Sequence, residues 1–265
     1  MLDVFFAYAM LGVFAGIMAG MLGIGGGVII VPALIFIFDW QGFSPDVIVI
    51  SAVATSLGTI IFTSVSAAWA QIKRGAVDWV IFRRWVLLVV VGSFFSGFIA
   101  QQMQPLVLKM AIALFLLLVS LIMLSKWVPN PSRQMPGAFG TSVLGLLSGV
   151  VSGLAGIGGG NIMVPLMVFF NVAMQRAAAT ASALGFPLAT VGAFGYVVSG
   201  WGSQKLEWSL GYVYLPAMLT IATFTVLMAP IGVALAHRMP APVLKRCFGA
   251  VLLIVSARML ITANM

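Results

Sequence analysis

Long apolar stretches separated by short polar turns run through the whole sequence. Ten such segments can be counted, and eight have, or nearly have, the length of about 20 residues that a membrane-spanning helix needs. Two of them are too short to span alone and directly follow glycine clusters. The pattern predicts an all-α polytopic membrane protein, whose segments are residues 2–21, 28–38, 47–70, 79–100, 106–124, 138–154, 162–170, 177–198, 208–236 and 243–262.

The amino-acid composition also indicates a membrane protein, and it excludes some other functions and features. Apolar residues make up 62% of the chain and charged residues only 7%, whereas soluble domains carry about 25% charged residues. The net charge of +8 comes from basic residues at the ends of apolar segments, so it predicts membrane topology and not nucleic-acid binding. A single cysteine, Cys247, excludes an internal disulfide.

The two halves of the chain are copies of one unit. Residues 23–32 read Gly-Ile-Gly-Gly-Gly-Val-Ile-Ile-Val-Pro, and residues 156–165 match them at eight of ten positions. Near the ends of the halves, Val-Leu-Lys at 107–109 matches Val-Leu-Lys at 243–245. We therefore predict two repeats of about five membrane segments each, with residues 1–125 as the first, 126–137 as a cytoplasmic linker and 138–265 as the second.

Equivalent loops of the two copies differ in charge. Basic residues cluster after the third segment in the first copy but after the fourth segment in the second copy. Because positive loops face the cytoplasm, the copies should be inverted relative to each other, with both termini outside. The residues concerned are Lys73, Arg74, Arg83 and Arg84 against Lys205, and Lys109 against His237, Arg238, Lys245 and Arg246.

Three consecutive glycines inside an apolar segment destabilise a helix, since each is about 1 kcal/mol worse than alanine. We predict a helix break at each cluster, followed by a short helix whose N-terminus begins inside the membrane, with Pro32 or Pro165 in its first turn. Free N–H groups there can bind an anion without a charged side chain. The alternative is that the glycines only permit tight packing. The site prediction covers Gly25, Gly26, Gly27, Gly158, Gly159 and Gly160.

Four polar residues complete the predicted substrate site. Thr55 and Ser56 lie in a segment that resembles the one around Ser182 in the second copy. Asn161 follows the second glycine cluster, where the first copy has Val28, and could supply an amide donor. A hydroxyl stripe that includes Thr55 either lines a polar path or bonds back to its own helix; its members are Ser51, Thr55, Thr59, Thr63 and Ser66.

Other small and polar residues have structural interpretations. Glycines spaced by four predict close helix packing; they are Gly12, Gly16, Gly20, Gly145, Gly149 and Gly153. Pro187 should break or kink the eighth segment. Arg176, at the start of that segment, is either an interfacial anchor or a guide for anions.

The absence of some residue types also restricts the function. All five acidic residues lie at predicted segment ends, which disfavours a cation pump or a proton relay built on carboxylates. The one histidine has no acid near it in the sequence, and nothing resembles a metal motif. We expect no catalytic residue, no bound metal and no cofactor.

The paired glycine-proline signature resembles that of the sulfite exporter TauE/SafE family, over nearly the whole chain. The resemblance implies a multi-pass permease of the bacterial cytoplasmic membrane for a small sulfur-containing anion such as sulfite, sulfoacetate or another sulfonate. Export by alternating access is the leading hypothesis. Import of such an anion or of another solute, a passive anion channel, and a membrane enzyme or assembly factor are the alternatives. Expected partners are the anion and the lipid bilayer, with no nucleic acid; a homodimer is left open.

Overall fold

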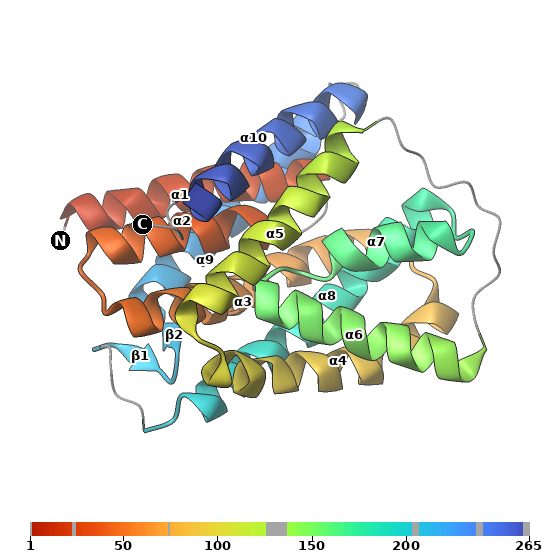
Figure 1. Cartoon of the computed structure of the whole chain (residues 1–265). Coiled ribbons are helices and arrows are strands. Elements are labelled where there is room, and N and C mark those ends of the chain that lie inside the picture. The colour runs from red at the N-terminus through yellow and green to blue at the C-terminus, as the bar shows by residue number, and fades with distance from the viewer. Residues whose placement is uncertain are drawn as a thin grey trace.

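The computed structural model describes residues 2–22, 25–73, 75–125, 137–202, 207–236 and 241–261. Within these residues the chain forms helices and one small hairpin (Figure 1). The first half contains α1 (Leu2–Leu22), α2 (Gly27–Trp40), α3 (Pro45–Lys73), α4 (Trp79–Gln102) and α5 (Pro105–Leu124). The second contains α6 (Ala138–Ala155), α7 (Gly160–Phe169), α8 (Met174–Ser199), β1 (Ser209–Leu210), β2 (Val213–Tyr214), α9 (Leu215–Ala236) and α10 (Ala241–Ile261).

The ten helices correspond to the ten predicted segments, and the all-α polytopic class is confirmed. Among the described residues, six helices are long and apolar enough to cross a membrane: α1, α3, α4, α5, α8 and α9. One boundary was wrong. The segment predicted at 208–236 begins with the antiparallel hairpin β1–β2, and α9 starts only at Leu215. Residues 126–136 lie outside the described part of the chain, so the cytoplasmic linker stays a prediction.

The predicted helix breaks are present at both glycine clusters. Gly25 and Gly26 have φ of 75°, a left-handed conformation open to glycine, and α2 begins at Gly27. In the second half, Gly156 has φ of 65° and ends α6, and α7 begins at Gly160.

One expectation about proline was wrong, and another was wrong in part. Pro32 and Pro165 lie inside α2 and α7, past the first turn, where each lacks the N–H that would bond the carbonyl four residues earlier. Pro187 does not break α8, which is continuous from Met174 to Ser199.

The helices of one half pack against those of the other in a reciprocal pattern. α1 lies along α9 while α6 lies along α4, and the equivalent helices pair as α3 with α8 and α5 with α10. A methyl group at Gly16 would lie 2.7 Å from the Thr225 carbonyl oxygen, and one at Gly149 would meet the Val89 carbonyl oxygen. The expected close packing at these glycines is therefore confirmed.

This packing follows the alignment of the two copies. The ungapped register that aligns Lys109 with Lys245 also aligns Val89 with Thr225, and Gly16 aligns with Gly149. Equivalent glycines thus contact equivalent residues, which is the pattern that two symmetry-related halves would give.

The central helices α3 and α8 run antiparallel. A methyl group at Gly185 would lie 3.8 Å from Ser64 Cβ, and one at Gly192 would lie 3.3 Å from Leu57 Cδ1. Residue numbers therefore rise along α8 as they fall along α3. Since α3 and α8 occupy equivalent positions in the two halves, this is the relation that inverted copies would have.

The bundle has two distinct ends. α1 begins and α10 ends at one, here called the terminal end, while α5 ends and α6 begins at the other, the linker end (Figure 1). α2 runs back toward the terminal end, and α7 runs back toward the linker end (Figure 1). Each short helix thus forms a hairpin with the helix before it, and the two hairpins enter the bundle from opposite ends.

Candidate functional site

The two glycine breaks contact each other inside the bundle. A methyl group at Gly25 would lie 3.8 Å from Gly158 Cα, and one at Gly27 would lie 2.6 Å from the Gly156 carbonyl oxygen. The contact needs glycine at position 27, because a side chain there would collide with the backbone of the second break. Segments far apart in the sequence therefore meet where both hairpins turn.

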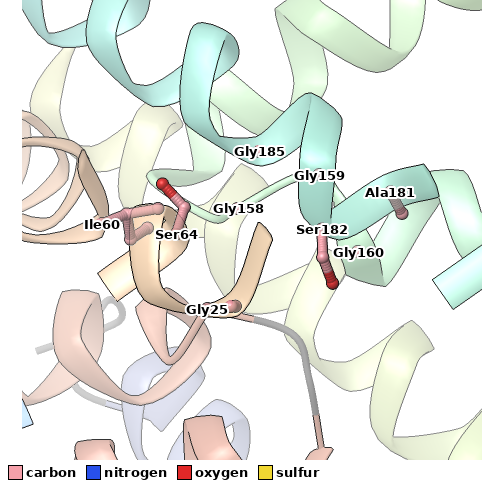
Figure 2. Close-up of a pocket in the computed structure, with 10 residues that line it drawn as sticks. Gly25, Ile60, Ser64, Gly158, Gly159, Gly160, Ala181, Ser182 and Gly185 are labelled. Carbon is pink, nitrogen blue, oxygen red and sulfur yellow. The ribbon is translucent and has the colours of Figure 1, made fainter. Parts of the chain in front are cut away.

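A small pocket, with a cavity volume of about 20 Å³, lies beside this contact, between the breaks and the central helices (Figure 2). In Figure 2, Gly158 and Gly159 lie between Ser64 of α3 and Ser182 of α8. Five of the ten predicted site residues line the pocket. The full lining is Gly25, Ile60, Ser64, Ala67, Gly158, Gly159, Gly160, Ala181, Ser182 and Gly185.

The pocket lies toward the linker end. Ser64 and Ala67 belong to the last turns of α3, and Ser182 to the first turns of α8, and both of these parts lie at that end. None of the lining residues is charged, and Ser64 and Ser182 supply its only side-chain hydroxyls. Any charge on a ligand here would be met by backbone dipoles and hydroxyl groups.

The N-terminus of α7 supplies free backbone donors at this pocket. The Gly159 carbonyl accepts from Ile162 and Met163, which leaves the N–H groups of Gly160 and Asn161 without an acceptor in the described part of the chain. A helix N-terminus carries about half a positive charge. Gly160 lines the pocket, so an anion there would lie close to these donors.

Asn161 is the most unusual residue at this end of α7. Its side chain is 7% exposed, and neither Nδ2 nor Oδ1 has a hydrogen-bond partner among the described residues. Leaving a buried polar group unpaired costs about 1–3 kcal/mol, so such groups call for a functional or structural reason. The equivalent residue of the first copy, Val28, is apolar and 1% exposed.

The hydroxyls of the pocket bond to their own helices. Ser182 Oγ donates to the Ala178 carbonyl at 2.9 Å, and Ser64 Oγ donates to that of Ile61 at 3.1 Å. For two of the five residues of the predicted hydroxyl stripe the same alternative holds, since Thr59 and Thr63 also bond back within α3.

The other predicted site residues face elsewhere. Gly26 packs against α1, where a methyl group would lie 3.2 Å from Ala19 Cβ. Thr55 Oγ1 accepts from the Tyr214 N–H at 3.0 Å, toward the terminal end. Ser56 Oγ donates to the Gly156 carbonyl at 2.8 Å and so ties α3 to the second glycine break.

Gly27 is likewise covered, since a methyl group there would collide with the second break and with Ile60. Ile60, Ser64 and Ala67 line the pocket but were not predicted from the sequence. Their spacing by four and three puts them on one face of α3, next to the hydroxyl stripe. Only the crossing with α8 made that face part of the pocket.

The fold and the site together define a class. The chain has discontinuous helices that meet in the middle of a polytopic bundle and present a free helix N-terminus to a pocket, as in many secondary transporters. Among the described residues, no cluster of side chains could hold a metal ion.

Comparison with known proteins gives the family. The sequence model of the family described as sulfite exporter TauE/SafE matches residues 8–259. The chain belongs to this family and is a multi-pass membrane transporter.

Three relatives illustrate the similarity, and each is named a probable membrane transporter protein. One from Haemophilus influenzae is 30% identical, covering 94% of this chain and 96% of the relative. One from Methanocaldococcus jannaschii is 26% identical, with 94% and 93% coverage. One from Bacillus subtilis is 28% identical, with 87% and 89% coverage. No solved structure matches the chain.

Proposed function

We propose that this transporter exports a small sulfur-containing anion, such as sulfite, sulfoacetate or another sulfonate, by alternating access. The observation that carries the proposal is the buried Asn161 at the free N-terminus of α7, whose amide has no partner among the described residues. Asn161 does not itself line the pocket, but it directly follows Gly160, which does. The anion would accept from the N–H groups of Gly160 and Asn161, from the Asn161 amide, and from Ser182 once its hydroxyl turns away from the Ala178 carbonyl. These four uncharged donors suit an oxyanion, because its negatively charged oxygens can each accept a hydrogen bond and such bonds are strong.

The distribution of charge supports a cytoplasmic linker end. Among the described residues, Lys73, Arg83 and Arg84 are exposed there, and positive residues mark the cytoplasmic side. The antiparallel α3 and α8 support inverted repeats. With this orientation the pocket lies toward the cytoplasm, where an export substrate is collected. A membrane potential of 100 mV, negative inside, favours expulsion of each negative charge by about 2.3 kcal/mol.

The test is flux through the purified protein in proteoliposomes. We expect saturable transport of sulfite or sulfoacetate, and acceleration by the same anion trapped on the opposite side, which a passive channel would not give. Ser182→Ala should raise KM for that anion. The matched control is Ser120→Ala, which removes a buried hydroxyl that donates to the Gly249 carbonyl between α5 and α10, away from the pocket.

Two results would refute the proposal. One is the absence of flux for every sulfur oxyanion in a protein that transports some other solute. The other is an equal response of KM to Ser182→Ala and Ser120→Ala, which would remove the pocket from the transport path.

A further inference from the structure

The alignment of the two halves gives pocket residues of α8 a counterpart in the other half. Gly185 corresponds to Gly58, and Ser182 corresponds to Thr55. Gly185 and Ser182 lie on the linker-end side of the helix crossing, so Gly58 and Thr55 lie on the terminal-end side. If both halves had the same conformation, Gly58 and Thr55 would line a second pocket that faces the terminal end.

That second position is filled. A methyl group at Gly58 would lie 2.6 Å from Met218 Sδ and 3.4 Å from Val213 Cγ1. Thr55 Oγ1, which is fully buried, accepts from the N–H of Tyr214. Strand β2 and the first turn of α9 therefore close over the residues that would otherwise face the terminal end.

Aromatic rings strengthen this closure. Tyr214 packs edge-on against Phe38 of α2 and Phe43 of the following loop, at centroid distances of 5.7 Å and 5.3 Å. Phe38 and Phe43 stack on each other at 4.8 Å. The end of the first hairpin is thus joined to β2 on the terminal-end side of the site.

The equivalent segment of the first half takes a different position. Phe82 is the counterpart of Met218, yet it packs with Val77 against Ala179 and Ala183 of α8. In the described part of the chain, no residue covers Gly185 in the same way, since the nearest atom to a methyl group there is Ser64 Cβ at 3.8 Å. The two halves therefore differ at this position: Met218 covers Gly58, whereas its counterpart Phe82 does not cover Gly185.

We propose that the segment from Val213 to Met218 is the gate of the terminal end, closed in this structure, and that the segment from Val77 to Phe82 is its counterpart at the linker end, open in this structure. Transport would exchange the two arrangements: Phe82 moves over Gly185 while Met218 leaves Gly58. This inference rests on the proposed transport function and identifies the moving parts.

The test measures which end of the site reaches water, without using any substrate. In a Cys247→Ser background, Ser182→Cys and Thr55→Cys are labelled in turn with a membrane-impermeant maleimide, in vesicles of either orientation. We expect Ser182→Cys to react from the linker face and Thr55→Cys to react slowly from the terminal face. These two rates report the two gates separately.

Two matched glycine variants should then change the equilibrium between the closed and open arrangements of the gates. Gly58→Ala collides with the flexible end of Met218, so it should open the terminal gate and speed labelling of Thr55→Cys by about tenfold or more, as expected when a minor conformation becomes populated. Gly185→Ala fits the open pocket but blocks closure by Phe82. It should leave the labelling pattern unchanged and abolish transport.

Met218→Ala removes the closing side chain without any collision, so it tests the gate even if Gly58→Ala folds poorly. Rapid labelling of Thr55→Cys in the parent protein would overturn the proposal, as would the failure of both Gly58→Ala and Met218→Ala to change its rate. Opposite responses of the two cysteines would support the gate even if no sulfur anion were transported, which would refute only the substrate.

Discussion

Replacing Asn161 with valine should stabilise the fold and also weaken anion binding. The first repeat already has a valine at the equivalent position, Val28, buried at 1% exposure, so the fold accommodates this side chain. Asn161 is 7% exposed and its amide nitrogen and oxygen are both unpaired. Removing the unpaired groups should raise the free energy of unfolding by about 1–3 kcal/mol.

Binding should change in the opposite direction. A hydrogen bond to a charged group contributes about 1.5–3 kcal/mol, which corresponds to an affinity loss of about ten- to a hundredfold for the anion. Unfolding would be followed in detergent with and without sulfite, and transport in proteoliposomes. The control is Ser152→Ala, since Ser152 Oγ is also buried and has no partner among the described residues, but Ser152 lies in α6 and is not adjacent in sequence to any residue that lines the pocket, whereas Asn161 directly follows Gly160.

Ser152→Ala should leave the affinity for sulfite unchanged. The reasoning fails if Asn161→Val lowers the free energy of unfolding while sulfite affinity stays at the parent value. That result would make Asn161 a structural residue whose partner is a bound water. The Asn161 side chain would then not help the free N–H groups of α7 to bind the anion.

Three other changes test separate contacts. Ser56→Ala leaves the Gly156 carbonyl without its buried donor, so the free energy of unfolding in detergent should fall by about 1–3 kcal/mol; no change would mean that the bond contributes nothing. Gly149→Leu places a side chain against the Val89 carbonyl, so no monodisperse protein should be recovered by size-exclusion chromatography, and normal recovery would contradict the packing of α6 on α4. Arg176→Gln removes an exposed cation at the start of α8; KM for the anion should rise by about two- to tenfold at low salt if Arg176 guides anions, and an unchanged KM would leave it an interfacial anchor.

Much of the secondary structure could be predicted because the membrane imposes strict rules on the backbone. Every N–H and C=O in the hydrocarbon region must be paired, so an apolar segment becomes a helix and its length gives its span. The helix breaks were equally accessible, since glycines at 25–27 and 158–160 oppose a helix. The hairpin at Ser209–Tyr214 was missed because it contains no charged residue and leads directly into the apolar helix that follows.

The site was harder to predict because it depends on distances between segments. Of the ten predicted residues, Thr55 and Ser56 were chosen by analogy with Ser182. The structure gives their hydroxyls partners in β2 and in the second glycine break instead. Ser64 was missed because it does not belong to the hydroxyl stripe and lies on a neighbouring face of α3.

The sequence by itself determined the class, the duplication and the positions where helices must break, because all three follow from local composition and from the identity of two peptides. Only the tertiary structure decided that the two Gly-Ile-Gly-Gly-Gly peptides touch, and that Asn161 is buried without a partner. It alone also decided that Met218 covers Gly58 while Gly185 stays uncovered. The two glycine peptides are nearly identical in sequence, so what covers Gly58 and leaves Gly185 uncovered depends on residues far from them in the sequence, which only the packing of the helices brings near.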